Sequence, residues 1–415
     1  MCYISFPVFD KASIYLYLNL LRVKSKQLTF IKFSDFYCWL LMYKYSSLKH
    51  SSRKDFAYFK TVSGTIMQLK EKLELGKEYP LAGEIAGIKE IEQISINALK
   101  QSFPDNIRPV LRDAHPKHHG CVRAEFIVHE DIPQELKVGI FKQPRTFTAG
   151  IRFSNNKVQD DRQKDVRGMA IKLFGVEGEK ILEKQKSEKT QDLLLINHPV
   201  FFIKDVQDYV AFFRARQAAK GKFPIKFFFP SLNFNKWHLK EFMIGMMMLN
   251  KKVSNPLAVR YWSSTPYKLG DRAIKFTAIP SSQNITPSVT PAPNYLRQTM
   301  IEHLKNQDAI FDFLIQLQTD PHKMPIEDPT IEWKSPFQKV ATIKIPHQQF
   351  TSPQQMEFCE HLSFTPWHSL PEHQPLGGVN RARKQVYKAL SELRHNLNNV
   401  VTKEPTEEDF LTLFR

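Results

Sequence analysis

The chain of 415 residues has an ordinary globular composition, with 42% hydrophobic and 24% charged residues. This length can bury a large core, and the composition excludes a collagen-like or low-complexity chain. The four cysteines are far apart and form no CxxC pair. That spacing argues against a zinc site or a disulfide framework and makes a reducing cytoplasm the default compartment.

The net charge of +17 is concentrated at the N-terminal end, where residues 1–60 contain ten Lys and Arg against three Asp and Glu. Such a segment can contact an anionic membrane surface or nucleic acid, although a solvated basic leader is the commoner case. Its apolar runs are too short to span a bilayer, and no secretory cleavage pattern follows them. We expect a basic extension over residues 1–60, of which residues 1–50 are dispensable, a soluble cytoplasmic protein and no nucleic-acid partner.

Helical and strand-like segments follow in a mixed order. A 3.6-residue apolar period predicts helices, and β-branched or aromatic runs between turn residues predict strands. The predicted helices cover residues 64–75, 85–102, 205–220, 234–251, 296–319 and 379–400. The predicted strands cover residues 123–128, 146–153, 169–174, 261–280 and 333–345. This order predicts an α+β domain around an antiparallel sheet over residues 61–402, with a loose acidic tail over residues 403–415.

The last predicted helix carries three polar side chains on one face. At about 100° per residue, Arg383, Tyr387 and Arg394 lie within about 40° of one another. Arg383 precedes Tyr387 by four residues, so its guanidinium can reach the phenol oxygen and favour the phenolate. A phenolate is a competent ligand for ferric haem iron. The structural alternative is a surface Tyr stacked with Arg.

Five segments, in the same order along the chain, resemble the haem catalase family. They are Arg112–Lys117 (R-x-x-H-x-K), Arg152–Ser154 (R-F-S), Asp165–Phe174 (D-x-R-G-x-A-x-K-x-[FY]), Asn197–Asp205 (N-x-P-x-F-F-x-[RK]-D) and Arg383–Tyr387 (R-x-x-x-Y) followed by Arg394. Each motif alone is weak, but together they extend over roughly residues 105–400. The resemblance implies an antiparallel β-barrel of the catalase type with surrounding helices and a proximal haem helix near the C-terminus.

The resemblance also assigns roles on the distal side of a haem b. His115 would be the acid–base group, since the reaction needs a side chain that titrates near neutral pH. Asn197 would donate an amide N–H to the outer peroxide oxygen, and Ser154 would fix the tautomer of His115. The alternatives are a helix-terminus histidine, a turn-forming asparagine and an ordinary strand serine.

On the proximal side of the haem, the resemblance makes Tyr387 the axial ligand of the iron, with Arg383 as its hydrogen-bond partner. Arg112, Arg152 and Arg394 would pair with the two haem propionates, because Arg suits bidentate carboxylate recognition.

Several features depart from the family's pattern. Residues 116–119 read Pro-Lys-His-His where the family has a small Ala-Lys-Gly run, and residues 388–393 lack the D-T-x-R pattern after the tyrosine. The helical region that follows the proximal helix in ordinary catalases has no counterpart. Trp262, within Tyr261–Tyr267, belongs to a motif of short, divergent catalase-like proteins, which look related to catalase-related peroxidases and allene oxide synthases.

These observations leave three functions open. We favour a haem enzyme that protects against peroxide, acting on hydrogen peroxide or an organic hydroperoxide as a catalase, or as a peroxidase with an organic electron donor. The second is a lipid hydroperoxide isomerase or lyase of the allene oxide synthase type, with a channel lined by residues 227–229 or 242–249. The third is a non-catalytic haem binder or a basic membrane- or nucleic-acid-associated protein. We expect a homo-oligomer.

Overall fold

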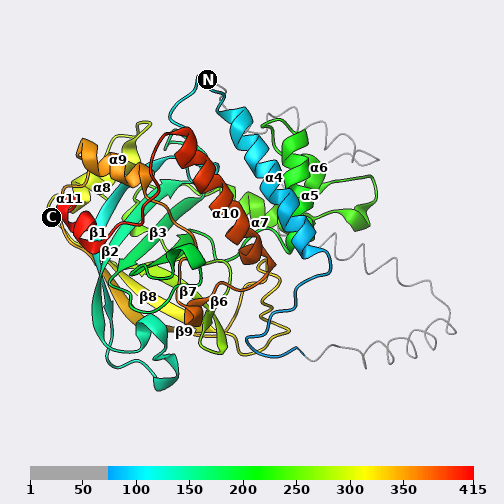
Figure 1. Cartoon of the computed structure of the whole chain (residues 1–415). Coiled ribbons are helices and arrows are strands. Elements are labelled where there is room, and N and C mark those ends of the chain that lie inside the picture. Colours follow the sequence, from blue (N-terminus) through cyan, green and yellow to red (C-terminus); the bar gives the residue numbers. More distant parts are fainter. Residues whose placement is uncertain (1–72) are drawn as a thin grey trace, which may run out of the picture. The chain divides into compact units, whose positions relative to one another are not determined.

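The structure, a computed structural model, describes residues 73–415, and Glu74–Arg415 belong to one compact unit (Figure 1). The basic extension expected over residues 1–60 lies outside the described residues, and so does nearly all of the helix predicted over residues 64–75. Within the described range, no helix combines the length and the apolar character needed to cross a bilayer.

A closed antiparallel β-barrel forms the centre of the unit. Its strands are β1 (His118–Val128), β2 (Arg145–Asn155), β3 (Arg167–Phe174), β4 (Thr190–Ile196), β5 (Tyr261–Trp262), β7 (Arg272–Pro280), β8 (Ala309–Leu317) and β9 (Phe337–Ile345). The strand order is β5-β4-β3-β2-β1-β9-β8-β7, and the pairing of β5 with β7 closes the ring of eight. The short β6 (Tyr267–Leu269) extends the sheet beside β7. The predicted α+β fold with a catalase-type barrel is thus confirmed.

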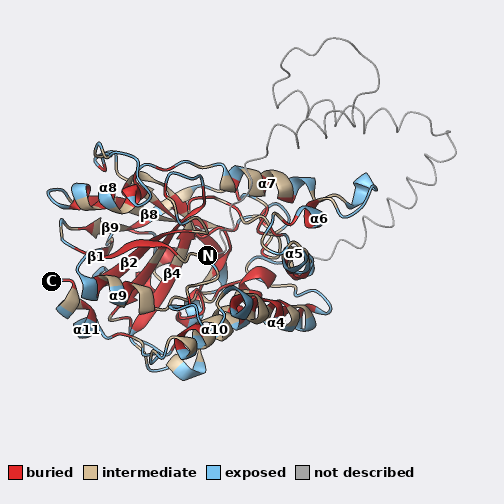
Figure 2. Ribbon diagram, turned by 90° about the horizontal axis from the view of Figure 1, so that it is seen from above, coloured by how far each residue is buried: buried red, intermediate tan, exposed pale blue. Residues whose placement is uncertain are grey.

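Aromatic and β-branched side chains fill the barrel. Along β8, buried residues alternate with half-buried ones, which is the period-2 pattern of a strand with one face on a core. The rings of Phe126 on β1 and Phe313 on β8 meet edge to face at 5.1 Å, and Phe276 on β7 stacks on Phe313 at 5.5 Å. Figure 2 shows these strands as the most deeply buried part of the unit.

Helices cover the barrel in two groups. In one, α4 (Glu84–Ser102), α5 (Val206–Ala218) and α10 (Gly378–Leu397) pack through a shared apolar cluster that includes Ile91, Val206 and Val386. The short α6 (Ile225–Phe228) and α7 (Leu239–Leu249) extend this group (Figure 1). The other group contains α8 (Tyr295–Leu304), α9 (Pro353–His361) and α11 (Glu407–Leu413). The helix predicted over 379–400 is therefore present as α10.

The long helix predicted over residues 296–319 is wrong. The segment is helical only to Leu304, and Ala309–Leu317 forms strand β8. The apolar residues of this stretch satisfy both the helical and the strand period. Hydrogen bonding to β7 on one side and to β9 on the other decides the conformation, and these partners are distant in the chain.

The loose acidic tail expected near the C-terminus is also wrong. Residues 407–413 form α11, which a capping box starts at Thr406. Phe410 and Phe414 are almost completely buried, and the ring of Phe410 stacks on Phe174 of β3 at 4.8 Å. Glu404 forms an ion pair with the fully buried Lys172. The acidic residues of α11, 407–409, are exposed, and Phe410 lies on the buried face, so the helix is amphipathic. The run of acidic residues was therefore misinterpreted as a loose tail.

Candidate active site

Four chain segments meet at one end of the barrel. His115 precedes the start of β1, and Ser154 lies at the end of β2. Gly168 lies at the start of β3, where it pairs with Ser154 on one side and with Ile196 of β4 on the other. Asn197 follows β4 directly. Because neighbouring strands are antiparallel, these starts and ends all lie at the same rim of the barrel.

The His115 side chain is held in one orientation. Its Nδ1 lies 3.0 Å from the Ser154 hydroxyl, and its backbone has a positive φ of 57°. The backbone N–H of His115 donates to the carbonyl of Asn156 at 2.9 Å, and Arg152 donates to the carbonyl of His115 at 3.0 Å. Because Nδ1 is engaged, Nε2 is the nitrogen left for a bound molecule. The expected contact between Ser154 and His115 is therefore present.

The absence of a side chain at residue 168 allows this close packing. A Cβ atom at Gly168 would lie 2.7 Å from two atoms of the His115 ring and 2.8 Å from Ser154 Oγ. Such distances are shorter than real contacts allow, so only glycine fits between the strand and the ring. The sequence motif contained Gly168, but no role had been assigned to it.

The environment of His115 keeps the imidazole neutral. Burial, followed by the positive charges of Arg152, Arg383 and Arg112, lowers the pKa of His115 to about 3. A neutral imidazole at pH 7 can accept a proton.

Asn197 has an amide nitrogen that is buried and without a partner. Its Oδ1 accepts from the backbone N–H of Arg167 at 2.9 Å, and its own backbone N–H donates to the carbonyl of Arg167 at 3.0 Å. These contacts fix the side chain, while Nδ2 has no hydrogen-bond partner among residues 73–415, which the structure describes. A buried donor without a partner costs stability, so Nδ2 is suited to donate to a bound molecule.

On α10, Arg383 and Tyr387 form the predicted i, i+4 pair. The Arg383 guanidinium donates twice to the Tyr387 oxygen, at 3.3 and 3.2 Å, and once to Asn380 Oδ1 at 3.0 Å. Burial opposes the charge on Arg383, but the phenol groups of Tyr387 and Tyr267 outweigh it and raise the pKa of Arg383. The guanidinium therefore stays charged beside the phenol oxygen.

Two of the other three predicted arginines, Arg112 and Arg394, contact Glu360 of α9. The Glu360 carboxylate accepts from Arg112 at 3.0 Å and from Arg394 at 3.4 Å, and its other oxygen lies 3.5 Å from His118. Burial, followed by the charge of Arg152, lowers the pKa of Arg112 to about 9. No sequence motif pointed to Glu360.

This cluster has a marked excess of positive charge. Arg112, Arg152 and Arg394 influence one another electrostatically, and Glu360 is the carboxylate that contacts two of them. The Nε atom of Arg152 is buried and has no hydrogen-bond partner. A ligand with two carboxylates would compensate this charge and use the free donor.

The residues therefore fit the haem that the sequence led us to expect. The arginine cluster suits the two propionates, and the Tyr387 oxygen, supported by Arg383, suits the axial position. The unpartnered Asn197 Nδ2 and the oriented His115 suit the opposite side of the ring.

A sequence model of the catalase family matches residues 105–224, which contain all the site residues on the barrel rim and none of those on α10. In this segment the chain is similar in sequence to the catalase family, and its fold is that of solved catalases. No curated protein sequence matches the chain.

Solved catalase structures share the fold of this chain at low sequence identity. A fungal catalase is 17% identical with a TM-score of 0.54, and the match covers 80% of this chain and 68% of that one. Catalase A from Saccharomyces cerevisiae is 18% identical with a TM-score of 0.53, covering 80% and 70%. A bacterial catalase is 15% identical with a TM-score of 0.50, covering 81% and 67%.

Proposed function

We propose that this protein uses haem b, with Tyr387 as the axial iron ligand, to reduce hydrogen peroxide or an organic hydroperoxide. The observation that supports this most directly is that one rim of the barrel holds both a neutral, oriented His115 and an Asn197 amide without a partner among the described residues. When bound, haem supplies the iron at which the peroxide O–O bond breaks.

The protein's own residues move and stabilise the proton and the charge. His115 accepts the peroxide proton at Nε2 and returns it to the departing oxygen, while Ser154 keeps the ring in place. Asn197 Nδ2 donates to the outer oxygen as negative charge develops there. Arg383 donates two hydrogen bonds to the Tyr387 oxygen and holds it in place.

We propose that peroxidase activity, with an organic electron donor, exceeds catalase activity. Rapid disproportionation needs a tuned distal channel and a tuned axial tyrosine, and this chain departs from the family's pattern after both His115 and Tyr387. The helix α10 continues without a break past Tyr387 to Leu397, as residues 388–393 had indicated. The aromatic residues expected to line a lipid channel, such as Phe227 and Phe228, instead pack against each other at 4.9 Å as core residues do.

Absorption spectroscopy tests the ligand assignment. The purified protein should show high-spin ferric haem with a phenolate charge-transfer band, and Tyr387→Phe should remove the band or the haem. The matched control is Tyr209→Phe, which removes another half-buried phenol that interacts electrostatically with Tyr387 and should keep the band. An unchanged spectrum in Tyr387→Phe would exclude Tyr387 as the ligand.

Kinetic assays test the chemistry. His115→Ala should bind haem but lose about 10²–10⁴-fold in the rate of peroxide consumption, the usual contribution of an acid–base group. Oxygen release, oxidation of a phenolic donor and loss of a fatty-acid hydroperoxide should be compared on one preparation. Oxygen release at an efficiency near ~10⁸ M⁻¹s⁻¹ would contradict the peroxidase assignment, and rapid consumption of the fatty-acid hydroperoxide without a donor would favour an isomerase.

A further inference from the structure

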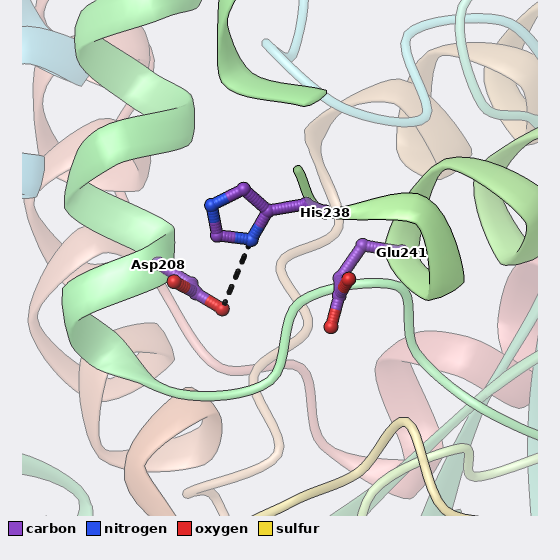
Figure 3. Close-up of side chains that lie close together, drawn as sticks. All are labelled: Asp208, His238 and Glu241. Carbon is purple, nitrogen blue, oxygen red and sulfur yellow. Dashed lines mark ion pairs between the residues drawn. The ribbon is translucent and has the colours of Figure 1, made fainter. Parts of the chain in front are cut away.

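Three side chains with metal-binding atoms converge between α5 and α7. Asp208 lies in the first turn of α5, His238 immediately precedes α7, and Glu241 lies in the first turn of α7. One oxygen or nitrogen atom from each lies within 4.8 Å of the corresponding atoms of the other two. Figure 3 shows Nδ1 of His238 facing the Asp208 carboxylate at 3.7 Å, with the Glu241 carboxylate beside them.

The Glu241 side chain is the feature that needs an explanation. Only 8% of this residue is exposed. Its carboxylate has no hydrogen bond or ion pair with any residue that the structure describes, while it lies beside a second carboxylate. Two carboxylates this close together repel each other. A bound cation would remove that repulsion.

The two lysines close to Asp208 and Glu241 in the sequence contact other residues. Lys240, which lies between His238 and Glu241 in the sequence, donates to Thr330 at 2.6 Å and lies 3.9 Å from Asp328. Lys204 lies 4.0 Å from Asp205, whose carboxylate caps α5 by accepting from the backbone of Asp208. These lysines are therefore oriented toward other acceptors.

The surrounding structure holds the histidine ring in place. The imidazole of His238 stacks on the ring of Phe227 at 4.6 Å, with an angle of 24° between the planes. The backbone N–H of His238 donates to the carbonyl of Phe228 at 3.0 Å. An oriented imidazole beside two carboxylates reduces the entropy lost when an ion binds.

We propose that Asp208, His238 and Glu241 bind a zinc ion that links α5 to α7. Imidazole nitrogen with carboxylate oxygens suits zinc better than magnesium or calcium, which prefer oxygen ligands alone. Zinc binds these atoms at about 2.0–2.2 Å, so tetrahedral ligands lie roughly 3.4 Å apart. Small rotations of the two carboxylates would bring the three atoms to that separation, and water would complete the fourth position.

The position of this site suggests a structural role. Asp208 is followed by Tyr209, whose ring contacts those of Phe201 and Phe213 and whose phenol interacts electrostatically with Tyr387 and Arg383. A metal link at Asp208 would stabilise the part of α5 that borders the Tyr387 side of the candidate active site. This proposal concerns a separate set of side chains and does not depend on haem binding.

Metal titration of the full-length protein tests the site. After removal of metal with a chelator, Zn²⁺ binding is measured by calorimetry and by competition with a chromogenic chelator, for the unchanged chain and for Asp208→Asn, His238→Gln and Glu241→Gln. Each substitution should remove one zinc equivalent or weaken its binding at least about 10²-fold, since even partners outside the direct ligands contribute 10–100-fold. The matched control is His347→Gln, which breaks the exposed His347–Asp308 pair and should leave the number of zinc equivalents and their affinity unchanged.

Two further measurements identify the ligand atoms and the effect of zinc on stability. X-ray absorption should show nitrogen and oxygen at about 2.0–2.2 Å and no sulfur at about 2.3 Å. Zinc should raise the melting temperature of the unchanged chain and of His347→Gln, but not of the nearly isosteric Glu241→Gln. Equal zinc binding by Glu241→Gln, His238→Gln and the unchanged chain would refute the proposal, and preferential binding of Mn²⁺ would refute the assignment to zinc.

Discussion

Replacement of Gly168 by alanine should disable the candidate active site while leaving the barrel intact. The added Cβ would lie 2.7 Å from Cε1 and Nδ1 of His115, whereas an ordinary contact begins at 3.4 Å. The ring must therefore move by about 0.7 Å, or the start of β3 must shift. Such a movement stretches the 3.0 Å contact with Ser154 and misplaces Nε2.

The expected loss of activity is about 10²-fold, because misplacement of a catalytic group by about 1 Å costs that much. The expected loss of unfolding free energy is about 1–3 kcal/mol, which is typical of an overpacked core. Peroxide consumption under steady-state conditions measures the first quantity, and urea denaturation followed by circular dichroism measures the second. The haem absorption band should persist, because Tyr387 and the arginine cluster are unchanged.

A glycine elsewhere provides the matched control. Gly245 lies within α7, and a Cβ there would come no closer than 4.0 Å to a ring atom of Phe228. Gly245→Ala should therefore retain activity and gain up to about 1 kcal/mol of stability from the better helix former. If Gly168→Ala retained activity within about threefold of the unchanged chain, the argument that this glycine positions His115 would be wrong.

Three other predictions follow from the fold and the sequence. Phe410→Ala should reduce the unfolding free energy by about 3–5 kcal/mol in denaturant titrations, because Phe410 is fully buried; a change below 1 kcal/mol would show that α11 is not anchored. His373 Nε2 accepts from the backbone of Ile140 at 2.9 Å, and burial lowers the pKa of His373 to about 4. Neutral His373 therefore contributes fully to the free energy of unfolding above pH 6.5, and this contribution, at most about 3 kcal/mol, is lost as the pH falls toward 4. When unfolding is measured at several pH values, the free energy of unfolding of His373→Gln should change less with pH than that of the unchanged chain. A chain beginning at Lys60 should still bind haem and keep its activity, since residues 1–50 carry none of the matched motifs; failure to incorporate haem would contradict this.

The sequence alone predicted the contacts that follow from the spacing of residues within one helix or one motif. The four-residue spacing of Arg383 and Tyr387 fixes their contact as soon as the segment is helical, and the structure shows that contact. The Ser154–His115 contact also agrees with the motif-based expectation, whereas the strand β4 that precedes Asn197 was not predicted. Motifs of this kind carry the information because their residues must lie at fixed positions along a strand or a helix.

Contacts between segments distant in the chain decided the features that the sequence did not predict. Residues 309–317 became a strand because β7 and β9 pair with them, although their apolar pattern also satisfies a helical period. Glu360 contacts arginines from two distant segments, and Glu241 meets Asp208 across two helices, so no local pattern reveals either arrangement. The acidic C-terminal segment is helical because Phe410 finds Phe174 in the barrel. Local sequence sets the preferences of a segment, but long-range pairing and burial supply the free energy that selects among them.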